Sequence, residues 1–183
     1  MAYSLDDFCR DCAASLRNNN AAGKEEVRSN LERLLANERF VDERLGPDAK
    51  EGVEVLYRDP ELGFCVLAHI NREPHASPPH DHGSSWAIYG QATGHTDMTE
   101  YRRVEGSGAG RAALEVTGRY RLEPGHAGLY DVGAIHAIDF CAGARFVRVT
   151  GTDLEQVSRL KFDLAGKSAT AVESAHMRDE TPA

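Results

Sequence analysis

The stretch SPPHDHGSSWAIYGQATGHTD, residues 77–97, places His80 and His82 two positions apart, just before an apolar run. On an extended strand, side chains at this spacing project to the same face, so both imidazoles can point into a barrel while Asp81 points away. Imidazole suits iron, zinc, copper and nickel better than magnesium or calcium. The pair is a candidate metal site, although two histidines at this spacing also occur by chance.

The bulk composition describes one globular domain. The chain has 183 residues, 41% of them hydrophobic, and a formal net charge of −8. Its acidic residues are scattered and no basic block stands out, which argues against nucleic acids and anionic membranes as partners. Residues 1–20 lack the features of a signal peptide, and no apolar run reaches membrane-spanning length. We therefore expect a soluble cytoplasmic protein, as a monomer or a homodimer.

Residues 1–48 are predicted to form a helical segment packed on the rest of the chain. Ser4 followed by Asp7 resembles a capping box, with aspartate in place of the usual glutamate or glutamine. Cys9 and Cys12 form a CxxC, but no second CxxC completes a structural zinc site, so we expect them on a buried helix face. The apolar face of the second helix consists of Val27, Leu31, Leu34 and Leu35.

From about residue 51 the pattern changes to short β-like runs separated by turns. Such a series without intervening helices predicts an antiparallel barrel or sandwich, which we place at residues 49–171. An additional edge strand is expected after Gly166, and residues 172–183 are expected to be a polar, disordered tail. The predicted strands cover residues 54–58, 64–70, 85–90, 95–104, 113–122, 127–132, 136–140, 145–151 and 158–164.

A third histidine follows a second pattern, GHAGLYDVGAIH at residues 125–136. With the first stretch, it resembles the two motifs of the cupin superfamily, G(x)5HxH(x)3–4E(x)6G and G(x)5PxG(x)2H(x)3N. The first motif is matched by His80, His82 and Gly94, and the second by Gly125, Gly133 and His136. The resemblance implies a mostly β fold, the cupin double-stranded β-helix or jelly-roll barrel, here with an N-terminal helical segment. It also implies that the three histidines bind a metal.

One departure from the motifs matters chemically. Trp86 or Ala87 stands where the first motif has glutamate, and three neutral histidines alone leave three positions open on one face of an octahedral ion. That suits a metal that binds a bidentate substrate together with O₂, and Fe(II) is the expected ion, with zinc and nickel as alternatives. The other departures are Pro74, Asp131 and Phe140, at motif positions for glycine, proline and asparagine.

A three-histidine cupin with a helical N-terminus resembles the cysteine dioxygenase-like, or thiol dioxygenase, family over roughly residues 5–170. The resemblance implies a mononuclear Fe(II) that binds the thiolate of a small mercapto acid and O₂ and yields a sulfinic acid. It also implies that Arg58, within LYRDPELGFCVLAHI, grips the substrate carboxylate. From the residues alone, Arg58 could equally be a surface arginine paired with Asp59 or Glu61.

The Ser-His-Tyr relay common in that family is missing from the strand RFVRVTGTD, residues 145–153. Phe146, Arg148 and Thr150 alternate onto one face of this strand, and an inward Arg148 would supply a second anchor for an anion. We place Tyr130 in the catalytic set with Arg58 and Arg148, as a hydroxyl facing bound O₂ or substrate. Each strand tyrosine could instead be a core residue with a satisfied hydroxyl. The tyrosines considered are Tyr57, Tyr89, Tyr101 and Tyr130.

The functional hypothesis is a non-heme iron dioxygenase that takes a small anionic substrate and O₂. Its substrate would be a mercapto acid of the cysteine, 3-mercaptopropionate or mercaptosuccinate type. One alternative is a three-histidine cupin of another class, such as a diketone-cleaving oxygenase or a zinc or nickel isomerase. The other is a non-catalytic cupin that binds a small molecule.

Overall fold

The N-terminal segment is helical, as predicted. The structure is a computed structural model, and it describes residues 2–17, 20–106 and 108–173. The predicted tail therefore lies outside the described residues from position 174 onward. The helices are α1 (Leu5–Leu16), α2 (Ala21–Leu35) and α3 (Glu38–Leu45).

The first helix begins at the predicted capping box. The Asp7 amide donates to Ser4 Oγ at 3.1 Å, and the Asp7 carboxylate accepts from the Ser4 amide at 3.1 Å. Each side chain satisfies a backbone N–H that the helix leaves unpaired, so aspartate replaces the usual glutamate here. Cys9 and Cys12 are free and buried on this helix, as their helical spacing predicts.

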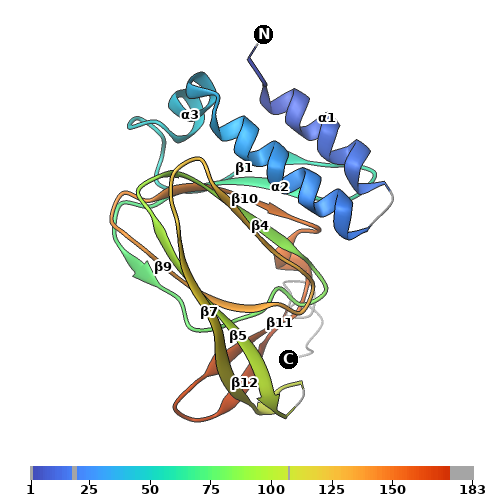
Figure 1. Cartoon of the computed structure of the whole chain (residues 1–183), viewed down its shortest axis with the longest axis vertical. Helices are drawn as coiled ribbons and strands as arrows, with labels where there is room; N and C mark the ends of the chain where they lie inside the picture. The colour runs from blue at the N-terminus through green and yellow to red at the C-terminus, as the bar shows by residue number, and fades with distance from the viewer. Residues whose placement is uncertain (1, 18–19, 107, 174–183) are drawn as a thin grey trace, which may run out of the picture.

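The strands form two facing antiparallel sheets and a small third one (Figure 1). The five-stranded sheet consists of β1 (Gly52–Arg58), β2 (Cys65–Ile70), β10 (Arg145–Thr150), β4 (Ala87–Thr93) and β8 (Ala127–Tyr130), in that order. The four-stranded sheet consists of β3 (His75–Ala76), β9 (Ile135–Phe140), β5 (Thr96–Glu105) and β7 (Ala113–Leu122). The third sheet consists of β11 (Arg159–Asp163), β12 (Ser168–Val172) and β6 (Gly110–Arg111).

The strand order identifies the architecture. Consecutive strands β2 and β3, β4 and β5, β7 and β8, and β9 and β10 alternate between the two facing sheets, as in a jelly roll. The predicted double-stranded β-helix is therefore confirmed. The strand expected after Gly166 is present as β12, but it lies between β11 and β6 rather than at the edge of its sheet. The two-residue strands β3 and β6 are not among the predicted strands, because segments this short carry no periodic pattern.

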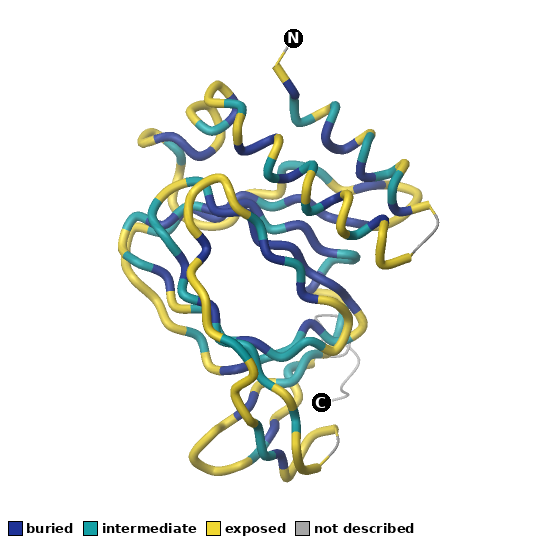
Figure 2. Tube along the Cα trace, in the orientation of Figure 1, coloured by how far each residue is buried: buried dark blue, intermediate teal, exposed yellow. Residues whose placement is uncertain are grey.

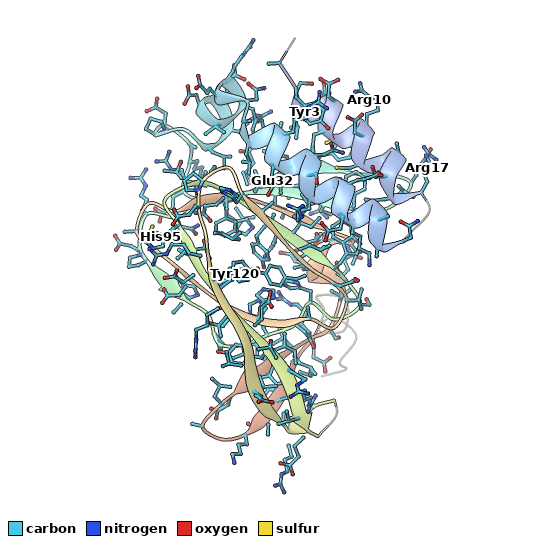
Figure 3. The ribbon with its side chains drawn as sticks, in the orientation of Figure 1. Tyr3, Arg10, Arg17, Glu32, His95 and Tyr120 are labelled. Carbon is cyan, nitrogen blue, oxygen red and sulfur yellow. The ribbon has the colours of Figure 1, made fainter. Side chains whose placement is uncertain are left out.

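The helices cover the outer face of the five-stranded sheet (Figures 1 and 2). Leu31 and Leu34 of α2 are fully buried in one core with Val147 and Val149 of β10. Glu32 of α2, labelled in Figure 3, also links the helix to the sheet. Its carboxylate accepts a hydrogen bond of 3.0 Å from the amide of Ala127 in β8. Among the described residues, no helix combines the length and apolar character needed to cross a bilayer.

Strand alternation sends the other side chains of the same sheet into the barrel. On β10, Phe146 packs in a separate interior cluster, whereas Arg148 and Thr150 line an interior cavity. Arg148 lies between Leu67 of β2 and Tyr89 of β4 in the sheet register. The prediction that Phe146, Arg148 and Thr150 share one face therefore matches the structure.

Gly90 on β4 allows α2 to approach the sheet. A Cβ at this position would lie 2.7 Å from Leu31 Cδ2 and 2.8 Å from Leu35 Cδ1. We predict that Gly90→Ala lowers the free energy of unfolding by ~1–3 kcal/mol, because two buried leucines must move. Denaturant unfolding followed by circular dichroism measures the loss. The matched control is Gly118→Ala on β7, whose nearest neighbour is the flexible Glu100 carboxylate at 3.3 Å; equal losses in both variants would contradict the prediction.

Candidate metal centre

The His-x-His segment lies between two strands that hold its backbone on both sides. The His80 amide donates to the His136 carbonyl at 2.9 Å, and the His136 amide donates to the His80 carbonyl at 3.0 Å. On the other side, Asp81 Oδ1 accepts from the amides of Gly83 at 3.0 Å and Leu160 at 2.9 Å. Asp81 therefore points away from the two histidine side chains, as the spacing predicts.

The structure brings the three predicted metal ligands together. One potential ligand atom from each of His80, His82 and His136 lies within 4.8 Å of the others. His136 stands on β9 directly after a turn at Gly133, whose φ of +79° suits glycine. His82 and His136 are buried, with exposed fractions of 3% and 0%. The site therefore belongs to the barrel interior rather than to its surface.

The ring nitrogens of these histidines are arranged as metal ligands require. His80 Nδ1 lies 3.0 Å from the Pro78 carbonyl, which favours a proton on Nδ1 and leaves Nε2 free for a metal. Both ring nitrogens of His136 are buried without a hydrogen-bond partner. A buried polar group in that state is costly unless another ligand satisfies it. The three side chains thus fit a bound divalent ion.

Burial also keeps the three imidazoles neutral. Desolvation, followed by the charges of neighbouring histidines and of Arg148, lowers the pKa of His82 to about 2 and that of His136 to about 3. Desolvation lowers the pKa of His80 as well. A metal binds the deprotonated imidazole, so no proton has to be displaced from these groups at neutral pH.

The ligand group contains no carboxylate. Among the described residues, the cluster that could hold a metal consists of the three histidines alone. At the two candidate positions for the motif glutamate, Ala87 packs in the interior cluster and Trp86 packs in the core that contains the helices. A methyl group thus occupies the interior position, so this chain has no fourth protein ligand from that strand.

The two predicted substrate arginines line one cavity of about 240 Å³. Arg58 lies at its exposed side and forms an ion pair with Asp153, the residue before the short 3₁₀ helix at Leu154–Gln156. It does not pair with its neighbours in sequence: Asp59 accepts from backbone amides and from Tyr57, and Glu61 pairs with Arg17. The alternative that pairs Arg58 with Asp59 or Glu61 is therefore wrong, and its partner is Asp153.

Arg148 lines this cavity and also acts electrostatically on the three histidines, which do not themselves line it. Its positive charge is one of the causes that lower the pKa of all three candidate ligands. Its Nε is buried without a hydrogen-bond partner. A guanidinium in this position can donate to an anion that lies between the cavity and the metal site.

The structure presents a different tyrosine hydroxyl to the ligands from the one expected. The Tyr130 ring packs on His136 with 4.1 Å between ring centroids, but its hydroxyl is hydrogen-bonded to that of Tyr120. Tyr120 of β7, labelled in Figure 3, is itself 38% exposed. The Tyr89 hydroxyl instead lies 3.2 Å from His82 Nε2. Tyr89, rather than Tyr130, is therefore the tyrosine whose hydroxyl lies next to a candidate metal ligand.

His69 is an interior histidine that ligand spacing does not reveal. It stacks on Phe146 with 4.6 Å between ring centroids, and its Nε2 is buried without a partner. Desolvation, with a contribution from Arg148, lowers its pKa to about 3. Strand alternation from Cys65 through Leu67 was the sequence signal that could have placed it inside.

The sequence matches no family model and no curated protein. Among solved structures, KdgF from Halomonas sp. has a TM-score of 0.42 at 12% identity, covering 54% of this chain and 74% of that chain. The Cnp3 cupin domain of Schizosaccharomyces pombe has a TM-score of 0.44 at 11% identity, covering 58% and 66%. Hydroquinone 1,2-dioxygenase PnpCD, in complex with Cd²⁺ and 4-hydroxybenzonitrile, has a TM-score of 0.44 at 15% identity, covering 57% and 66%.

These similarities are remote, with TM-scores below 0.5. The fold assignment rests on the strand order of the two facing sheets, with His80 and His136 bridged inside them. The chain therefore has the cupin fold, with a three-histidine site in the barrel.

We predict that His136→Gln abolishes metal binding, because it removes one ligand of three and leaves an incomplete set. The wild-type protein should bind about one ion of Fe(II), zinc or nickel per chain, and the variant less than ~0.1 after dialysis. Elemental analysis of the dialysed proteins measures the content. The matched control is His75→Gln on β3, an exposed histidine outside the group. Retention of a full equivalent by the His136 variant would contradict the site.

We also predict that His69 makes the fold sensitive to acid. Its pKa in the folded protein, about 3, lies below the ordinary value of 6.5. The unfolded chain therefore gains a proton first as the pH falls, and stability is lost below about pH 6.5. Between pH 7 and pH 5 this amounts to about 2 kcal/mol, which His69→Leu should remove from the pH dependence of urea unfolding. The exposed His75→Leu is the control, and an unchanged pH dependence in the His69 variant would refute the assignment.

Proposed function

We propose that this protein is a non-heme iron dioxygenase that oxidises the thiol of a small mercapto acid to a sulfinic acid. The observation that carries the proposal is a buried group of three neutral histidines, without a carboxylate, beside the inward guanidinium of Arg148. The overall reaction is RSH + O₂ → RSO₂H, in which both oxygen atoms enter the product and sulfur loses four electrons to O₂. No further reductant is needed.

The chain supplies a ligand set that suits iron. His80, His82 and His136 would hold the ion and leave one face of it open. When bound, Fe(II) would supply a site for the substrate thiolate and O₂ together. The alternatives zinc and nickel also accept imidazole, so the metal found in the protein purified without added metal distinguishes the oxygenase from a zinc or nickel isomerase.

Arg148 is the group that we assign to the substrate carboxylate. Its side chain lines the cavity with a buried, unpartnered Nε, and hydrogen bonds to a carboxylate would fix the orientation of the acid. Arg58, which the resemblance favours for this role, is engaged with Asp153 instead. The half-buried Leu67 on the same cavity wall supports an acid with a short apolar chain.

Tyr89 is a positioning residue in this proposal. Its hydroxyl lies 3.2 Å from His82 Nε2, and its ring centroid lies 5.6 Å from that of His136. A hydroxyl in this position can hydrogen-bond to a ligand on the open face of an ion held by the three histidines. It could thereby replace the hydroxyl of the Ser-His-Tyr relay, which this chain lacks. Tyr89→Phe keeps the ring packing and removes that hydrogen bond alone.

The direct test is oxygen consumption by the Fe(II)-loaded protein with cysteine, 3-mercaptopropionate and mercaptosuccinate in turn. We expect uptake with at least one of these acids and one sulfinic acid formed per O₂ consumed. Mass spectrometry of the product with ¹⁸O₂ should show both atoms incorporated. No uptake with any of the three acids would refute the proposal.

We predict that Arg148→Gln lowers kcat/KM for the active acid by ~10- to 100-fold, chiefly through a higher KM. A charge-assisted hydrogen bond to the carboxylate contributes about 1.5–3 kcal/mol, and glutamine cannot replace the charge. Steady-state oxygen uptake measures both constants. Arg102→Gln is the matched control, because Arg102 lies exposed on β5 and pairs with Glu115. A change in the control equal to that in the Arg148 variant would contradict the assignment.

A further inference from the structure

The cavity that Arg148 lines contains two positive groups, and an ion pair neutralises one of them. Arg58 and Arg148 both line it, together with Asp153 and Glu155. The Arg58 guanidinium donates to the Asp153 carboxylate, and this hydrogen bond is the largest cause that raises the pKa of Arg58. Burial, the largest single cause, raises the pKa of Asp153, but the hydrogen bonds from Arg58 and the Glu155 amide and the charges of Arg58 and Arg148 together hold this pKa below its usual range. The charge of Arg58 is thus compensated within the protein.

The inner part of the cavity has unsatisfied donors. Arg148 Nε and Thr150 Oγ1 are both buried without a hydrogen-bond partner, and Thr150 is 0% exposed. The two residues lie two positions apart on β10 and so face the same side. One carboxylate accepts from both groups, because each of its oxygens can take a hydrogen bond. Buried polar groups of this kind are otherwise costly.

These observations point to an acid with one negative group. The donors of Arg148 and Thr150 match a single carboxylate, and the second guanidinium is already paired with Asp153. A second carboxylate would have to compete with Asp153 for Arg58, and a carboxylate that leaves water without gaining a cation loses free energy.

We infer that the site selects mercapto acids with a single carboxylate, and that Asp153 determines this specificity by neutralising Arg58. The inference rests on the proposed function for the identity of the ligand, a mercapto acid. The preference for a single carboxylate is supported by the contacts of the cavity wall. Among the three acids named above, it favours 3-mercaptopropionate and cysteine over mercaptosuccinate.

The substitution Asp153→Asn tests the pairing without removing the local fold. Asp153 Oδ1 accepts a hydrogen bond of 3.1 Å from the Glu155 amide at the start of the 3₁₀ helix. Asparagine retains a carbonyl oxygen for that bond, because it caps helices as well as aspartate does. In the variant the positive charge of Arg58 is therefore no longer neutralised by a carboxylate at position 153. The hydrogen bond from the Glu155 amide is retained.

The experiment measures binding rather than turnover. Isothermal titration calorimetry of the zinc-loaded protein gives Kd for 3-mercaptopropionate and for mercaptosuccinate under anaerobic conditions. The wild type should bind 3-mercaptopropionate about tenfold more tightly, the value of one charge-assisted hydrogen bond. Asp153→Asn should shift the ratio of the two constants about tenfold toward mercaptosuccinate. The double variant Arg58→Gln with Asp153→Asn should lose that gain.

Glu155→Gln is the matched control, because it removes the same charge from the same wall without breaking the pair with Arg58. Its ratio should stay within about twofold of the wild type. An equal shift in Glu155→Gln, no shift in Asp153→Asn, or no binding of either acid by the wild type would overturn the inference. If the ratio shifts as expected but the iron-loaded protein consumes no oxygen, the proposed function fails and the inference on the acid stands.

Discussion

Two backbone hydrogen bonds between His80 and His136 determine the rest of the site. They join the His-x-His segment to β9, although the two are far apart in the sequence. Because residues that pair in this way present their side chains to the same face, both imidazoles enter the barrel together. His82, two positions on, then completes the group. The three ligands are thus arranged by the sheet rather than by contacts among the side chains.

The five-stranded sheet packs against the helices with one face and lines the barrel interior with the other. Val147 and Val149 of β10 pack with the helices, whereas the intervening Arg148 lines the cavity. A slip of this strand by one residue would move the arginine into the apolar layer and the valines into the cavity. The packing of α2 on the sheet, made possible at Gly90, therefore fixes the register that the site needs.

The sequence predicted those parts of the site that local patterns encode. The His-x-His spacing and the glycine turn before His136 are short-range features, and they placed all three candidate ligands correctly relative to one another. The partner of Arg58 could not be predicted, because Asp153 follows a different strand and nearer acidic residues were available. The choice between Tyr89 and Tyr130 depends on how far each hydroxyl reaches across the barrel, which a strand pattern does not record.

The hydrogen bonds on both edges of the ligand segment would also affect how the site takes up an ion. Asp81 secures the segment to Gly83 and Leu160 on one side, while His80 secures it to β9 on the other. Ligands held in place before the metal arrives lose little conformational entropy on binding, so the site is preorganised. Several divalent ions then compete for the same rigid group, and the occupant follows from their relative affinities and their supply in the cell.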